Sequence, residues 1–363
     1  RLTPKGCFQM RVNVPFERST RSVAADWVEL VALLNTSVAN EQNLIRSQAI
    51  IRESDHGTVL TDVDAEPVDE EILESENDAL SERVYEELTY REQVLGCRYP
   101  FEVVSEYGKW ALQRRKPNDD AEEAAHNCYV CCLLISAIHS DLLPTQNDHD
   151  VFKGSAQVLQ IESYLTAAEV LGGCAYWFGF PRPDGSGMLK AIQDLALSMG
   201  TAVAPTYRPL GLSPHAKDET VDIVAWRPFL DGQSGSIVAY GQVASGRNWD
   251  TKPIKSFIDG HFLSWFTKVP SHKYIELLFV PFPQHHEQPE EVGRDFRVIA
   301  SERARLREKD YGVVIDRLRL TELMALSKVN ERYDRSEYER YEAEVQAWIA
   351  NALLYARKED TVS

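Results

Sequence analysis

The 363-residue chain contains no long uninterrupted hydrophobic run. Its best candidate, residues 128–139 (CYVCCLLISAIH), is about half the roughly 20 residues that a membrane-spanning helix needs. This length predicts a buried helix. The first residues also lack the charged-then-apolar pattern of a secretory signal. We therefore expect a protein without a membrane-spanning segment.

Cysteine is sparse, with six residues in the whole chain: Cys7, Cys97, Cys128, Cys131, Cys132 and Cys174. Such a low content argues against a disulfide framework and for a reducing, cytoplasmic compartment. His126, Cys128 and Cys131 invite a zinc interpretation, but a structural zinc site normally shows a second closely spaced ligand pair. No such pair is visible, so we predict buried core thiols.

The common catalytic fingerprints are also missing. We find no Gly-x-Ser-x-Gly element and no dinucleotide-binding motif. The segment Ser245-Gly246-Arg247-Asn248 lacks the spacing of a phosphate-binding P-loop.

Net positive charge is absent, and the chain carries a formal charge of −17. Residues 61–90 hold twelve acidic residues and one basic residue, Arg83, so most of the excess lies in one segment. We interpret this segment as a solvated loop and helix face. The alternatives are a DNA mimic or a docking site for a basic partner.

Hydrophobic periodicity predicts helices over 19–52, 69–95, 101–116 and 121–142. No period-two alternation extends far before residue 145. We therefore predict a helical N-terminal domain over residues 1–145, and residues 142–154, rich in Pro, Asn and Asp, as its boundary.

The hydrophobic pattern changes in the middle of the chain. It predicts the order helix, strand, helix, strand, strand, helix, strand. The expected helices are 158–171, 188–199 and 254–266, and the expected strands are 175–180, 221–226, 236–243 and 274–281. An Asp-Gly turn between 226 and 236 joins two strands as a hairpin. Charged helices at 298–309 and 321–357 follow. The fold class is therefore α/β (α+β), with a core at 150–300 and a C-terminal helical extension at 301–363.

Asp222 stands inside an otherwise apolar strand, VDIVAW, and Gln242 ends its hairpin partner, in AYGQVASG. A lone buried carboxylate costs several kcal/mol unless it is paired or binds a metal. Oxygen ligands of this kind suit Mg²⁺ or Mn²⁺. The pair predicts a metal site at one end of the hairpin.

An acid in the first strand of a hairpin, followed by (Asp/Glu/Gln)-x-Lys in the second, resembles the PD-(D/E)XK, or restriction-endonuclease-like, nucleases. The resemblance covers about residues 150–285 and includes the order helix, strand, hairpin, helix, strand. It implies a further acid from the preceding helix, where Glu162 matches in Gln160-Ile161-Glu162-Ser163. The helical first domain and the GQVASGRNW segment resemble proteins of bacterial anti-phage defence.

The sequence departs from this family at Ala244, which occupies the usual lysine position. That lysine normally supports the attacking water and the charge of the transition state. In some members it moves to the following helix. Lys252 is the candidate that we favour, with Lys255 and Arg247 as alternatives.

Each site residue also has a purely structural explanation. Asp222 could pair with a nearby cation, Gln242 could bond to backbone, and Glu162 could lie on a helix surface. Trp249 fits a core position better than a base-stacking one.

The first hypothesis is a Mg²⁺- or Mn²⁺-dependent nuclease that cuts DNA in bacterial defence. Asp222, Gln242 and Glu162 would bind the metal, Lys252 would assist, and a helicase or ATPase subunit would supply a basic surface. The second is a catalytically inactive nuclease-fold subunit that clamps DNA or regulates a complex. The third is a helical scaffold with an incidental sheet.

Overall fold

The computed structural model describes residues 11–13, 20–34, 39–40, 42, 70–106, 109–147, 149–231, 233, 235–251, 253–284 and 294–357, without the side chains of 70–74, 106, 247 and 251. The helices are α1 (Arg21–Leu34), α3 (Glu70–Leu95), α4 (Asp120–His139), α5 (Asp150–Leu171), α6 (Met188–Met199), α7 (Lys255–Gly260), α8 (Phe296–Tyr311), α9 (Arg317–Asn330) and α10 (Arg335–Arg357). The strands are β1 (Ala39–Asn40), β2 (Phe101–Glu106), β3 (Lys109–Arg114), β4 (Cys174–Trp177), β5 (Ile223–Arg227), β6 (Ile237–Val243), β7 (Ile275–Phe279) and β8 (Val313–Ile315).

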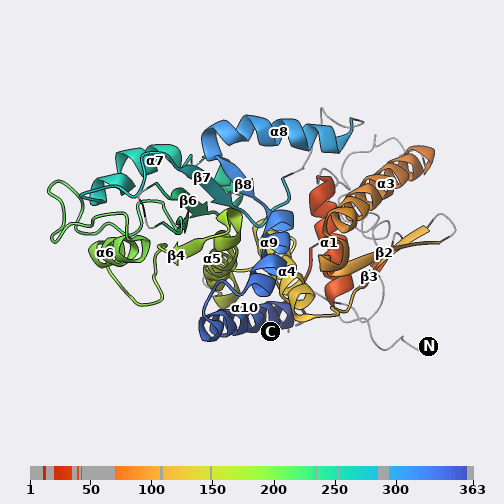
Figure 1. Ribbon diagram of the computed structural model, residues 1–363. Helices are drawn as coiled ribbons and strands as arrows, with labels where there is room; N and C mark the ends of the chain where they lie inside the picture. The colour runs from red at the N-terminus through yellow and green to blue at the C-terminus, as the bar shows by residue number, and fades with distance from the viewer. Residues whose placement is uncertain are drawn as a thin grey trace.

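A five-stranded mixed sheet forms the centre of the C-terminal half, in the order β4-β5-β6-β7-β8. β4, β5 and β6 are successively antiparallel, whereas β7 and β8 run parallel to β6. α5 covers one face, and α6 and α7 lie on the other (Figure 1). The result is a three-layer α/β/α arrangement in which the sheet is buried on both sides.

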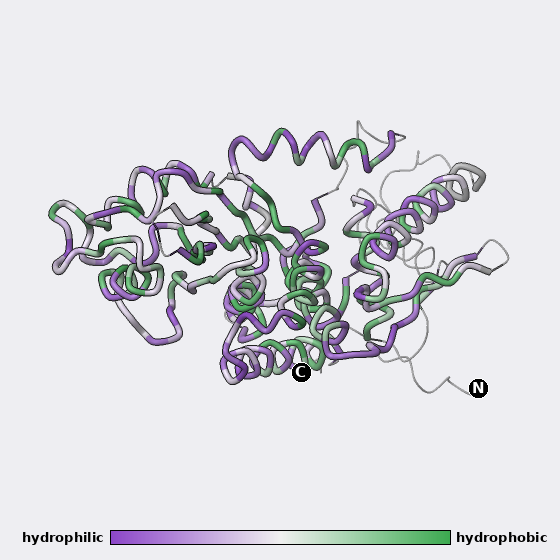
Figure 2. Tube along the Cα trace, in the orientation of Figure 1, coloured by the Kyte–Doolittle hydropathy of each residue, from purple (hydrophilic) through white to green (hydrophobic). Residues whose placement is uncertain are grey.

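The β5 sequence explains this double burial. Ile223 and Ala225 join the core on the α5 side, and Val224 and Trp226 join the core on the α6 side. A strand that is buried on both faces needs a continuous apolar run instead of an alternating one. The hydropathy colouring in Figure 2 shows the same concentration of apolar residues in the centre of the molecule.

The predicted α/β (α+β) fold class is confirmed. The predicted order from 158 to 281 is also confirmed, because α5, β4, α6, β5, β6, α7 and β7 follow one another in that order. The hairpin of β5 and β6 lies in the middle of the sheet, so the hypothesis of a helical scaffold with an incidental sheet is wrong. The short strand β8 was not predicted.

The helix predicted over 101–116 is wrong, because this segment forms the hairpin of β2 and β3, which β1 extends to three strands. In β3, Trp110 and Leu112 are buried while Lys109 and Gln113 are exposed. This two-residue alternation is a strand pattern. It is only two repeats long, which is too short to compete with the surrounding helical periodicity.

One buried cluster joins the N-terminal and C-terminal halves. It contains residues from α1, α3, α4, α5, β5, α9 and α10. α9 packs on both α4 and α5, and α10 packs on the other side of the same pair (Figure 1). The proposed divisions at 145 and 300 stay predictions, and the three segments share this core.

A buried network of charged side chains lies within this cluster. Arg317 of α9 donates from both terminal nitrogens to the two carboxylate oxygens of Asp26 in α1, at 2.8 and 2.9 Å. Arg91 of α3 donates to the same carboxylate at 2.8 Å, and Ser136 of α4 donates to it at 2.8 Å. Asp26 therefore joins four helices at one point.

Glu29 completes the network. It lies 2.9 Å from Arg91 and accepts hydrogen bonds from Tyr99 and Tyr129 at 2.6 and 2.7 Å. Burial raises the pKa of Glu29 in spite of Arg91. Burial also raises the pKa of Asp26, but the two arginines outweigh it and lower that pKa to about 2. Asp26 is thus the fixed negative charge that balances the guanidinium groups.

The acidic segment belongs in part to α3. Asp78, Glu82 and Glu86 are exposed on this helix, and Glu87 points inward to Arg91 at 2.7 Å. A solvated helix face is therefore confirmed for these residues, while residues 61–69 lie outside the described part. No helix in the described ranges combines the length and hydrophobicity needed to cross a membrane.

Substitution of Arg317 by Met should lower the free energy of unfolding by about 3–5 kcal/mol, because it leaves a buried carboxylate under-compensated. Arg335→Met is the matched control, since Arg335 pairs with Glu339 at an 88% exposed position and should contribute at most about 1 kcal/mol. Chemical denaturation would measure both. Equal losses would show that the buried pair does not stabilise the fold.

Candidate functional site

Asp222 lies where two inner strands of the central sheet end, immediately before β5 and beside the end of β6. Its backbone N–H donates to the Gly241 carbonyl at 2.8 Å, and its Oδ2 accepts a 2.7 Å hydrogen bond from the Val243 N–H. The side chain is 8% exposed. The strand pair therefore places Asp222 against the backbone of Gly241 and Val243, the two neighbours of Gln242 in β6.

The end of β4 closes the other side of Asp222. The N–H groups of Phe178 and Gly179 both donate to the Asp222 carbonyl, at 2.8 and 2.7 Å. A Cβ atom at position 179 would lie 2.7 Å from Asp222 Oδ1. Only glycine therefore lets this backbone approach the carboxylate so closely.

A strained turn immediately precedes Asp222 in the chain. Glu219 and Thr220 have φ angles of +51° and +72°, a region that residues other than glycine rarely adopt and β-branched ones such as threonine least of all. Asp218 supports the turn, since its Oδ1 accepts from the Thr220 N–H at 3.0 Å and its carbonyl accepts from the Val221 N–H. Strain of this kind is concentrated at functional sites.

Gln242 contributes a buried amide. Its side chain is 6% exposed, and its Oε1 has no hydrogen-bond partner in the described part of the chain. Because side chains alternate along β6, Gln242 shares a sheet face with Val238 and Tyr240. A buried acceptor without a donor is costly, and a bound cation would satisfy it.

Glu162 does not join this site, which corrects its predicted placement. Gln160 is the α5 residue that contacts Asp222, with its Nε2 donating to Oδ1 at 3.3 Å. Two positions along a helix differ by about 200°, so Glu162 faces away. It lines a small cavity together with Tyr338 and Glu342 of α10.

The pattern around Glu162 could have indicated this orientation. Val158, Leu159, Leu165 and Thr166, three or four residues away on the same helical face, are all buried. Near Gln160, Ala156 and Gln157 are exposed. The helix was therefore predicted correctly, but its rotation about its own axis was not.

Glu162 is instead an unusual buried acid. Burial raises its pKa to about 8, a hydrogen bond from the Cys128 thiol opposes this, and the Glu342 carboxylate adds to the rise. Cys128, Cys131 and Cys132 of α4 are completely buried, which confirms the predicted core thiols. His126 lies elsewhere, with its Nε2 2.9 Å from the Cys97 carbonyl oxygen.

The predicted amines contribute no described contact to Asp222. Lys255 lies 3.8 Å from Glu276 on β7, and Lys252 and the Arg247 side chain are outside the described residues. Ala244 and Trp249 are buried in a small core at the end of β6, so the predicted core position of Trp249 is confirmed. Lys252 stays a prediction.

The loop after β4 carries residues that the sequence reasoning missed. Phe180 is 45% exposed beside the site, and the ammonium group of Lys217 lies 5.1 Å from its ring centre. Arg182 holds the two loops together by donating to the carbonyl oxygens of Lys217 and Ser186, at 2.5 and 2.9 Å. No short motif signals this contact, because it joins segments 35 residues apart.

The donors at this edge fit one hydrated Mg²⁺ or Mn²⁺ ion better than an enclosed metal centre. No group of three His, Cys, Asp or Glu side chains within the described ranges is placed to hold a metal. The Asp222 carboxylate and the unpartnered Gln242 Oε1 remain as oxygen donors. Mg²⁺ often binds through one or two protein oxygens, several waters and the phosphate of its substrate.

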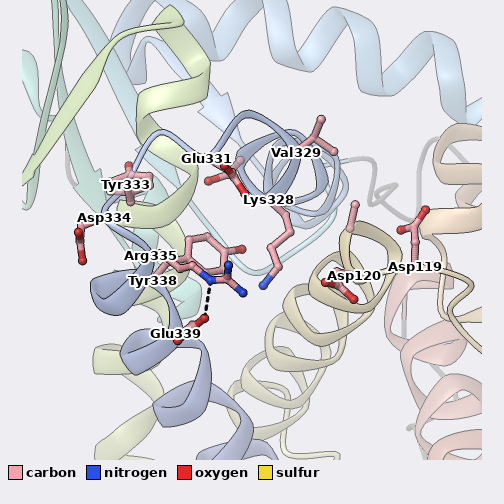
Figure 3. Close-up of a pocket in the computed structure, with 12 residues that line it drawn as sticks. Asp119, Asp120, Lys328, Val329, Glu331, Tyr333, Asp334, Arg335, Tyr338 and Glu339 are labelled. Carbon is pink, nitrogen blue, oxygen red and sulfur yellow. Dashed lines mark hydrogen bonds and ion pairs between the residues drawn. The ribbon is translucent and has the colours of Figure 1, made fainter.

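A separate cavity of about 790 Å³ lies where the beginning of α4 meets α9 and α10 (Figure 3). Most of its charged groups are already engaged. Arg335 pairs with Glu339, Lys328 pairs with Glu342, and Asp119 caps α4 through the Glu122 N–H. The cavity therefore offers no unsatisfied group comparable to Gln242.

Comparisons with known proteins add no relative. No protein-family model matches this chain, and neither the curated proteins nor the solved structures contain a significant match.

Substitution of Thr220 by Gly should raise the free energy of unfolding by about 1 kcal/mol, because glycine adopts the positive φ without steric cost. Thermal or chemical denaturation would measure the gain. Thr267→Gly is the control, since Thr267 is exposed and has no positive φ, and it should lower stability. A loss at both positions would mean that the turn at 220 is not strained.

The raised pKa of Glu162 predicts a pH-dependent stability. The folded chain holds a proton that the unfolded chain releases, so stability is fully present below pH 4.5 and is lost as the pH rises through about 8. The slope reaches at most about 1.4 kcal/mol per pH unit. Glu162→Gln should flatten this decline between pH 5 and 8, as followed by denaturation at several pH values. The exposed control Glu123→Gln should leave it unchanged. A decline that persists in Glu162→Gln would contradict the assignment.

Proposed function

We propose that this chain is a metal-dependent nuclease. It hydrolyses DNA phosphodiester bonds at the end of the central sheet where Asp222 lies. The observation that carries the proposal is the buried Asp222 carboxylate beside a strained turn, with the unpartnered amide oxygen of Gln242 on the neighbouring strand.

The order of elements supports this proposal. The resemblance to restriction-endonuclease-like proteins implies helix, strand, hairpin, helix, strand, with an acid on the first hairpin strand. α5, β4, the hairpin of β5 and β6, α7 and β7 follow that order, with α6 as an additional helix between β4 and the hairpin, and Asp222 precedes β5. The same order recurs in unrelated activities, so the site must carry the functional argument.

The residues of the site have distinct roles in this proposal. Asp222 and Gln242 would hold the metal, which supplies a water of lowered pKa and neutralises phosphate charge. The Val243 N–H fixes Oδ2 of Asp222, and Gln160 orients Oδ1. Lys252, the predicted supporting amine, keeps that role as part of the proposal.

Positive charge for a DNA backbone is concentrated on α8. This helix carries five basic and three acidic residues in a chain of net charge −17. Figure 1 shows it lying across one side of the molecule. A groove of about 630 Å³ runs between α8, α3 and the beginning of α9, and Arg297, Arg305 and Arg319 line it. Phosphate contacts of this kind dominate affinity for nucleic acid.

The overall acidity suggests that a partner shares the work of binding DNA. A helicase or ATPase subunit with a basic surface fits this requirement, in the cytoplasm and in bacterial defence against phage. Both the compartment and the partner are part of the proposal, and they rest on the composition and the resemblance.

A second candidate function is a catalytically inactive subunit that clamps DNA or regulates a complex. Two observations favour it: Glu162 faces away from Asp222, and the buried Ala244 replaces the usual lysine. Such a protein would bind DNA without cutting it.

Cleavage of plasmid and linear DNA in Mg²⁺ or Mn²⁺, with and without a candidate partner, separates the two. Asp222→Asn should abolish the activity, and a loss of 100-fold or more corresponds to roughly 3 kcal/mol of barrier. Glu162→Gln should retain activity because its side chain lies elsewhere. Gln157→Ala, exposed on the same helix as Gln160, is the surface control.

Cleavage that survives in Asp222→Asn would reject this site. No cleavage by the folded wild type in any condition, together with DNA binding, would establish the inactive subunit instead.

A further inference from the structure

The loop that follows β4 presents an aromatic ring to solvent beside Asp222. Phe178 is completely buried, whereas Phe180, two residues later, is 45% exposed. Gly179 between them lies against the Asp222 carboxylate. The exposed ring is therefore one residue away from the backbone that contacts the candidate site.

This ring is held in place from several directions. The Phe180 N–H donates to Asp218 Oδ2 at 3.2 Å, within the strained turn that leads to Asp222. Arg182 is 5% exposed and stacks 4.6 Å from the Phe178 ring. It also binds the Lys217 carbonyl, so the loops of Phe180 and Lys217 form one unit with Asp222.

The chemistry around Phe180 suits an anionic aromatic ligand. The Lys217 ammonium lies 5.1 Å from the centre of the ring, and the Lys217 side chain is exposed. A ring face stacks on a nucleobase, and an adjacent ammonium group pairs with a phosphate. Neither group is needed to fill the core, because Phe178 already occupies the core position of this loop.

We propose that Phe180 and Lys217 form a stacking platform for an unpaired nucleotide next to Asp222, so that the substrate is single-stranded DNA or a single-stranded region of a duplex. The inference rests on the proposed nuclease function. In a duplex both faces of each internal base are covered by its neighbours, so Phe180 can stack only on a base that has left the helix. The platform would thus select DNA that is already open.

The test is direct binding of a fluorescein-labelled oligothymidylate of 12 nucleotides, in EDTA, so that neither metal nor cleavage enters the result. Phe180→Ala should weaken binding roughly 5- to 140-fold, the range that corresponds to loss of one base stack. Phe180→Leu should weaken it similarly, and Phe180→Trp should retain wild-type affinity. An abasic oligonucleotide of the same length should bind wild type as weakly as it binds Phe180→Ala.

Phe229→Ala is the matched control. Phe229 is 51% exposed and follows β5, so it lies at the opposite end of that strand from Asp222. Its removal should leave affinity unchanged. Lys217→Gln should reduce the slope of log affinity against log salt by about 0.7, the contribution of one phosphate contact on a single strand.

Unchanged affinity in Phe180→Ala, equal affinity of Phe180→Leu and wild type, or equal binding of the abasic oligonucleotide by wild type would each overturn the platform. Absence of any oligonucleotide binding by wild type would also overturn it. Thermal denaturation of each variant confirms folding.

The two proposals fail in different ways. Stacking without cleavage would reject the nuclease and keep the platform. Metal-dependent cleavage with no effect of Phe180 on binding would reject the platform alone.

Discussion

The bidentate pair between Asp26 and Arg317 is the interaction on which the rest of the arrangement depends. It joins Asp26 in the first described helix to a residue 291 positions later in the chain, in a place where neither charge reaches water. Because an unpaired ion there would be strongly unfavourable, α1, α3, α4 and α9 can pack only in the register that brings these groups together. α9 also packs on α5, and α5 supports the face of the sheet that ends at Asp222. The position of the candidate site is thus coupled to the charge network through two helix contacts.

Sequence patterns predicted the central sheet well, for identifiable reasons. Apolar strands buried on both faces, an Asp-Gly turn and glycine-terminated helices are local signals, and α6 begins and ends at the predicted residues, Met188 and Met199. The three-residue strand β8 was missed because it is too short to show a pattern. The hairpin over 101–114 was missed because its alternation is brief and helices surround it.

The candidate site was predictable only where it depends on neighbouring strands. Asp222 and Gln242 lie at the adjoining ends of neighbouring strands through the β5–β6 register, which the hairpin turn determines. Gln160 was confused with Glu162 because periodicity predicts a helix but fixes its rotation only when the apolar stripe is narrow, and α5 is buried around most of its circumference. Phe180 and Lys217 meet through a buried arginine that bonds to backbone carbonyls. Such a contact has no sequence spacing by which to recognise it.

The distance along the chain between Asp26 and Arg317 has a consequence for synthesis. At about 5–20 residues per second, α1 leaves the ribosome roughly 15–60 seconds before α9 exists. During this interval Asp26 and Glu29 have Arg91 of α3 as a partner but not Arg317. The interior that α1 begins is therefore completed only after α9 has been made.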